Sequence, residues 1–66
     1  MVVILNGKEI EVTADLTVLG LLEARGIGTG SVVVEVNREI VPEAAFGETK
    51  LNDGDHLEVL RFVGGG

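Results

Sequence analysis

The sequence has no cysteine, tryptophan or tyrosine, and it has only one proline and one histidine among 66 residues. Without cysteine the fold cannot depend on disulfide bonds, and a lone histidine cannot build a metal site. The apolar start, Met1 to Leu5, lacks the basic flank of a signal peptide and is too short to span a membrane. We therefore expect a soluble, cytoplasmic protein with no metal and no membrane contact.

Basic side chains are also scarce. The chain has eleven acidic residues and five basic ones, which gives a net charge of −6. Phosphate backbones repel such a chain, so nucleic acid is excluded as a partner, whereas basic protein surfaces are favoured. No nucleophile–base pair is evident, and we interpret His56 as a surface residue rather than a general base. The acidic Asp53 and Asp55 are better explained by a turn around Gly54 than by cation binding.

Hydrophobic residues make up 45% of the chain, enough for the core of one small domain. In the first half, Asn6-Gly7 separates two strand-like runs, residues 1–5 and 8–12, and so predicts a hairpin. Apolar residues then recur at helical spacing over residues 16–25. Thr17 or Asp15 can cap this helix, and Gly26 ends it.

In the second half, valines dominate residues 32–36, and a tight turn at 37–38 leads to a short strand at 39–41 that ends at Pro42. Residues 43–46 predict one helical turn that brings Phe46 to the edge of the core. The last strand covers residues 56–63. One helix among these strands predicts an α+β fold, a mixed sheet with the helix packed on one face. We expect one domain over residues 1–63 and a flexible glycine tail over 64–66.

The tail, Gly64-Gly65-Gly66, places an α-carboxylate on a narrow arm without side chains. A carboxylate becomes an acyl donor once ATP converts it to an acyl-adenylate, and only glycine fits a slot that closes tightly on the backbone. A frayed terminus without function is the alternative interpretation of the same three residues.

Several stretches together resemble the small sulfur-carrier proteins of the β-grasp, or ubiquitin-like, fold, and most of all the ThiS family of thiamine biosynthesis. They span nearly the whole chain: Leu5-Asn6-Gly7-Lys8-Glu9, Leu16 to Leu22, Val36-Asn37-Arg38-Glu39-Ile40-Val41-Pro42, Leu51-Asn52-Asp53-Gly54-Asp55 and Val63-Gly64-Gly65-Gly66. Gly20 departs from the family, because a stronger helix former is usual there, and Phe46 stands where a larger aromatic is expected.

The resemblance implies a carrier rather than an enzyme. A ThiF-like enzyme, using ATP and Mg²⁺, would adenylate Gly66, and sulfur from a cysteine desulfurase would convert it to a thiocarboxylate. Gly64 and Gly65 would thread the active site of the partner. A ThiG-like thiazole synthase would receive the sulfur, and the carrier would bind no cofactor of its own. Delivery to molybdopterin or another pathway, a ubiquitin-like protein modifier and a plain interaction module remain alternatives.

The resemblance also implies four or five strands, with the first and last parallel at the centre of the sheet. Strand alternation then divides the side chains between two faces. We expect these residues to face the helix residues Val18, Leu21 and Leu22: Val3, Leu5, Ile10, Val12, Val34, Val36, Leu57 and Val59. Four others, Val2, Ile4, Leu60 and Phe62, should form one apolar patch with an acidic rim on the open face. Such a patch is typical of a partner-binding surface.

Overall fold

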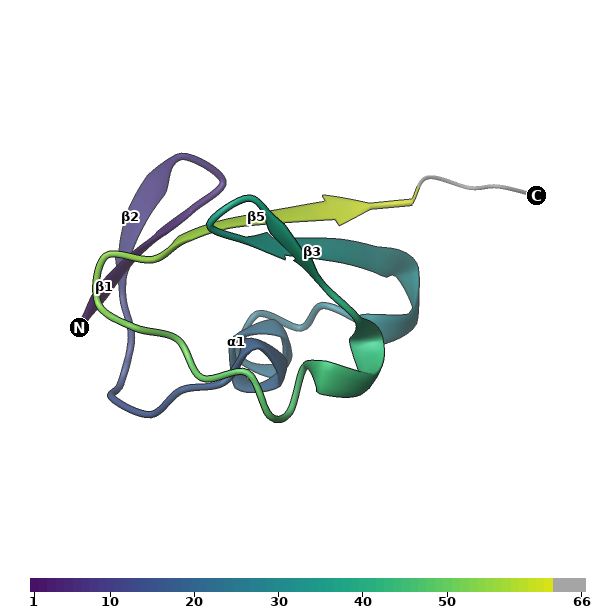
Figure 1. Ribbon diagram of the computed structural model, residues 1–66, viewed down its shortest axis with the longest axis horizontal. Helices are drawn as coiled ribbons and strands as arrows, with labels where there is room; N and C mark the ends of the chain where they lie inside the picture. The colour runs from purple at the N-terminus through teal and green to yellow at the C-terminus, as the bar shows by residue number, and fades with distance from the viewer. Residues whose placement is uncertain (63–66) are drawn as a thin grey trace.

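The computed structural model describes residues 1–62, which form a five-stranded sheet with one α-helix on one face (Figure 1). The strand order is β2-β1-β5-β3-β4. The elements are β1 (Val2–Leu5), β2 (Lys8–Glu11), α1 (Val18–Ala24), β3 (Val32–Val36), β4 (Glu39–Val41) and β5 (His56–Arg61), with two short 3-10 helices at Thr29–Ser31 and Glu43–Ala45. This confirms the expected fold class. The expected domain end at residue 63 and the tail 64–66 lie outside the described residues.

Two hairpins form the two sides of the sheet, and both turn on residues with positive φ. Asn6 and Gly7 have φ of 49° and 85° between β1 and β2, and Asn37 and Arg38 have φ of 51° and 71° between β3 and β4. Two successive residues with positive φ give the turn whose twist matches that of the paired strands. The Asn-Gly signal therefore predicts the first hairpin correctly.

The first and last strands of the described chain lie side by side in the middle of the sheet. Strand β1 runs parallel to β5, with Ile4 beside His56 and Leu5 beside Leu57. Strand β3 pairs antiparallel with β5 along its whole length, from Val36 opposite Leu57 to Val32 opposite Arg61. This confirms the parallel central pair expected from the family resemblance.

Helix α1 begins at Thr17, whose hydroxyl accepts a hydrogen bond from the Gly20 N–H at 3.0 Å. Of the two predicted caps, Thr17 is therefore correct, whereas Asp15 lies exposed in the preceding turn. A Cβ on Gly20 would come within 2.7 Å of Leu16 Cδ1 and 3.3 Å of Thr17 Oγ1. The glycine in mid-helix is thus explained by the close approach of the segment that caps the helix.

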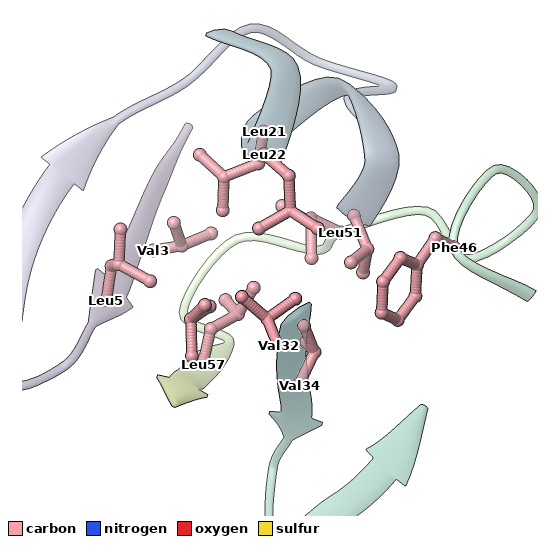
Figure 2. Close-up of a cluster of buried hydrophobic side chains, with 11 residues drawn as sticks. Val3, Leu5, Leu21, Leu22, Val32, Val34, Phe46, Leu51 and Leu57 are labelled. Carbon is pink, nitrogen blue, oxygen red and sulfur yellow. The ribbon is translucent and has the colours of Figure 1, made fainter. Parts of the chain in front are cut away.

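The core lies between the sheet and α1, where Val3, Leu5 and Leu57 point toward Leu21 and Leu22 (Figure 2). All the predicted core residues belong to this cluster or pack against it. Three further residues are buried beyond what the sequence pattern indicates. Phe46 is 2% exposed and lies within the core rather than at its edge, and Leu51 and Val32 are buried although neither belongs to the predicted core. Within residues 1–62, no helix is long and apolar enough to cross a membrane.

Candidate functional site

Strand β5 leads directly to the glycine tail, and its side chains alternate between the core and the open face. Leu57 and Val59 are buried, whereas Leu60 and Phe62 are 56% and 66% exposed. The Phe62 N–H still donates to the Ser31 carbonyl at 2.9 Å, so β3 and the residue before it hold the chain as far as Phe62. The fold therefore fixes the position from which the tail starts.

Asn6 supports β5 where β1 ends. Its Oδ1 accepts the Val59 N–H at 2.8 Å, and its Nδ2 donates to the Val59 carbonyl at 3.3 Å. Its own N–H donates to the Leu57 carbonyl at 2.9 Å. The carboxamide thus takes the place of one further strand residue beside β5, a role that the sequence signal for a turn does not reveal.

The four residues of the predicted patch do not lie together as one cluster. Ile4 lies beside His56 at the start of β5, whereas Leu60 is four residues further along the strand, about 13 Å away. Val2 and Ile4 are half-buried, opposite Glu11 and Glu9 of β2. The parallel register, which the sequence alone does not specify, separates the predicted patch into two parts.

The open face carries two further apolar residues that the sequence analysis does not include, and one of them lies near the tail. Half-buried Val33 of β3 is directly opposite Leu60, and Ile40 of β4 is 67% exposed. We call the residues Val33, Leu60 and Phe62 the tail-side patch, and Val2 and Ile4 the β1 patch. Ile40 is opposite Glu35 and lies outside both patches. Strand alternation carries the signal for Val33, because its neighbours Val32 and Val34 are buried, and for Ile40, because its neighbour Val41 packs against the core.

Charged residues lie between the two patches. Glu58 of β5 is opposite Glu35 of β3, and both line a shallow hollow of about 400 Å³ with Asn37, Arg38 and His56. Like charges in directly opposite positions are unfavourable in a free sheet. Among the described residues, no group of three or more histidine and acidic side chains is arranged to hold a metal ion.

The acidic residues before β5 have structural roles. Asp53 Oδ1 accepts the Val2 N–H at 2.7 Å. Asp55 is 8% exposed, and its two carboxylate oxygens accept hydrogen bonds from Asn37 Nδ2 at 2.9 Å and the Asn52 N–H at 2.7 Å. These contacts join the turn to β1 and to the β3–β4 hairpin, which agrees with the interpretation of both aspartates as turn residues.

Comparison with known proteins identifies the family. The model of the ThiS family matches residues 3–66. The chain belongs to the ThiS family. The match includes the three C-terminal glycines, the predicted attachment and threading residues, which lie outside the described part of the structure.

The relatives that are similar to this chain include short proteins of its own length and much longer ones. The sulfur carrier protein ThiS of Bacillus subtilis is 38% identical over 94% of this chain and 96% of its own length. The thiazole synthase of Paramagnetospirillum magneticum is 42% identical over the whole chain, which spans only 20% of that protein. The crystal structure of ThiS from Geobacter metallireducens is 39% identical, with a TM-score of 0.86 and full coverage of both chains. This likeness identifies the sheet and helix as the β-grasp arrangement of ThiS.

Proposed function

We propose that this chain is the sulfur carrier for thiazole formation in thiamine biosynthesis, acting as a protein cosubstrate and not as an enzyme. The observation that carries the proposal is the ThiS-family match, which extends through the glycine tail to residue 66. The described geometry supports it, because β5 and its partners fix the residue from which the tail starts. We expect the protein to act in the cytoplasm, where ATP-dependent activation takes place.

The proposed chemistry occurs at Gly66. A carboxylate oxygen of Gly66 attacks the α-phosphorus of ATP in a ThiF-like enzyme, pyrophosphate leaves, and an acyl-adenylate forms. Mg²⁺ bound to the nucleotide neutralises the charge that develops on the phosphates. The terminal sulfur of a persulfide supplied by a cysteine desulfurase then attacks the acyl carbon, and AMP leaves. A thiol reductant cleaves the S–S bond of the resulting acyl disulfide, and the product is a thiocarboxylate. Gly64 and Gly65 lie in the slot of the enzyme, where a side chain would prevent closure.

A ThiG-like thiazole synthase is the acceptor that we propose for the sulfur. In Paramagnetospirillum magneticum and Magnetococcus marinus, a segment similar to this chain makes up about a fifth of a protein named thiazole synthase. A carrier and an acceptor that share one polypeptide act at high effective concentration, which favours a partnership between the two functions. This observation favours thiazole formation over delivery to molybdopterin or protein modification.

We propose that partners dock on the open face of the sheet. In the tail-side patch, Leu60 and Phe62 are exposed and adjoin the start of the tail, and half-buried Val33 is opposite Leu60. The β1 patch, Val2 and Ile4, lies further from the tail and contributes a second, smaller contact. Glu9, Glu35 and Glu58 border these patches, so the surface fits a partner with apolar groups ringed by basic ones.

The tail provides the direct test. The purified chain, a ThiF-like enzyme, ATP, Mg²⁺, the sulfur donor and a thiol reductant are combined, and the mass of the intact carrier is measured. We expect a product heavier by the difference between sulfur and oxygen. Deletion of Gly66, or Gly65→Leu, should abolish this product while leaving the free energy of unfolding within about 0.5 kcal/mol of the parent.

The matched control is Gly28→Leu, at a loop glycine with a φ of −71°, where an added Cβ would meet no atom within 4 Å. This variant should be activated like the parent. Undiminished thiocarboxylate yield from the Gly65 and Gly66 variants would contradict the carrier proposal. Addition of thiazole synthase to the parent product then tests the acceptor, because sulfur should leave the carrier only when that enzyme and its other substrates are present.

A further inference from the structure

Strand β2 is an edge of the sheet, and part of its backbone has no partner. The Met1–Val12 pair exchanges hydrogen bonds in both directions, at 2.9 and 2.8 Å. In an antiparallel ladder such pairs alternate, so Ile10 also bonds to β1, while the N–H and C=O groups of Glu9 and Glu11 point away from it. Within residues 1–62, no other segment pairs with these groups.

An open groove of about 520 Å³ runs beside this edge, between β2 and α1, with an apolar floor and with Glu11, Thr13 and Arg25 at its border. Ile10 and Val12 form its sheet side, and Leu21 and Ala24 form its helix side. Leu16 closes one end. Ile10 and Val12 also pack against the core, so the groove lies on the helix side of the sheet, next to the free backbone groups of β2.

We propose that β2 and this groove form a second docking site, which binds an extended segment of a partner protein with alternating apolar and basic residues. A free strand edge supplies backbone hydrogen bonds to an added strand, and an adjoining pocket selects its alternate side chains. The two features occur here side by side, so both requirements of strand addition are met.

The charges of β2 determine the proposed sequence of the segment. In a strand added beside β2, the residues opposite Glu9 and Glu11 lie on the open face, where opposite charge is favourable and like charge is not. The residues between them point to the helix side, into the groove. Arg25 and Glu11 both border that groove, so charge selects neither sign there, and its apolar floor favours an apolar side chain.

The same charges argue against a second copy of this chain as the occupant. Pairing of β2 with β2 of another copy would bring Glu9 and Glu11 against the same carboxylates. Short, charged edge strands are a common means of preventing such self-pairing. A segment with lysine or arginine at alternate positions relieves this repulsion, and the net charge of −6 further favours a basic partner.

The docking site lies at the opposite side of the sheet from the start of the tail. Strand β1 ends beside Leu57, and Phe62 is five residues further, about 17 Å along β5. In Figure 1, β2 and the end of β5 lie at opposite ends of the molecule. A protein bound along β2 therefore leaves the tail free to enter the active site of another enzyme, so that the carrier can remain held while it is modified.

A short peptide tests the proposal. The probe is an acetylated, amidated peptide of alternating lysine and valine, about six residues long, the usual length of a strand. It is titrated into the ¹⁵N- and methyl-labelled protein, and NMR chemical shifts and amide exchange are measured. We expect saturable shifts at Glu9, Glu11 and the groove methyl groups, and slower exchange of the Glu9 and Glu11 amides. The matched peptide with glutamate in place of lysine should not bind.

Variants at the β2 edge and in the groove test the two parts of the site, and a distant variant controls for net charge. Glu11→Pro removes one free N–H and one carboxylate without breaking the ladder to β1 and should weaken peptide binding about fivefold, more than Glu11→Gln, which removes the charge alone. Ala24→Trp, at an exposed helix position, fills the groove and should weaken binding about tenfold. Glu58→Lys makes the same kind of change in net charge as a charge reversal on β2, but far from the groove, and should change the affinity less than twofold.

The outcomes are decisive in both directions. Absence of saturable shifts with millimolar peptide overturns the proposal, as do shifts confined to the tail-side patch or equal binding of the glutamate peptide. Ala24→Trp should also give the parental thiocarboxylate yield, because its effect is confined to the second site. Loss of peptide binding with intact activation therefore distinguishes this proposal from the proposed carrier function.

Discussion

The contact between Asn6 and β5 allows a prediction whose size can be worked out from the structure. Asn6→Gly should lower the free energy of unfolding by about 2 kcal/mol, because it removes the two side-chain hydrogen bonds to Val59, each worth roughly 1 kcal/mol net. Glycine adopts the φ of 49° found at this position without strain. The Asn6→Gly variant therefore isolates the contribution of the carboxamide.

Asn6→Ala should cost more, about 3 kcal/mol, since the same bonds are lost and alanine, unlike asparagine, has no polar side chain to ease the left-handed conformation, which adds roughly 1 kcal/mol. Alanine is normally the less disruptive of the two substitutions in regular structure, so this order is diagnostic. A domain of this size has a total stability of roughly 3–10 kcal/mol. A loss of 2–3 kcal/mol is therefore easily measured and approaches the whole stability at the lower end of that range.

Urea unfolding followed by far-ultraviolet circular dichroism is the suitable assay, because the chain has no tryptophan or tyrosine for fluorescence. Amide exchange at Val59 provides a local measurement, and we expect it to accelerate in both variants. The control is Asn52→Ala, an exposed asparagine whose side chain makes no hydrogen bond within residues 1–62. That change should stay within about 0.5 kcal/mol of the parent. Equal stability of Asn6→Gly and the parent, or a smaller loss for alanine than for glycine, would refute the reasoning.

Two further predictions concern the core and the open face. Phe46→Ala should destabilise the fold by about 3–5 kcal/mol, because the ring is fully enclosed between α1 and the sheet, and a urea midpoint near that of the parent would contradict its central position. Phe62→Ala should weaken binding to the ThiF-like enzyme, measured by calorimetry, by about 1 kcal/mol or more, whereas Ile4→Ala, further from the tail, should weaken it less. A larger loss for Ile4→Ala in a folded variant would assign the main contact to the β1 patch instead.

Most of the fold can be predicted from local sequence signals. Asn6-Gly7 indicates the first hairpin, helical spacing with Thr17 indicates α1, and strand alternation places Leu57 and Val59 in the core. Each of these signals depends on residues that are close in sequence, so no knowledge of tertiary packing is needed. The parallel pairing of β1 and β5 is different, because it comes from family resemblance alone.

The predictions from sequence are wrong or incomplete where contacts join segments that are distant along the chain. Leu51 has the sequence context of a turn residue, because it precedes Asn-Asp-Gly-Asp. Its N–H nevertheless donates to the Leu16 carbonyl at 2.8 Å, and its side chain is 3% exposed. The predicted patch is correct in its outward orientation but not in its continuity, since alternation specifies a face and not a register. Likewise, nothing local to Asn6 indicates that its side chain will bond to a residue 53 positions away.

The contacts of β5 decrease along the strand toward the glycine tail, at which we propose that the chemistry occurs. At its start the strand has neighbours on both edges, β1 and β3, and Leu57 is almost fully buried. At Val59 the side chain of Asn6 replaces β1, and by Phe62 the described contact is a single hydrogen bond to Ser31, on the β3 side. Toward the tail, β5 therefore first loses its neighbouring strand on one edge and then its contacts with the core. A partner can approach Leu60 to Phe62 from the open face and from the edge that β1 leaves free, so it needs to break none of the described contacts of the core.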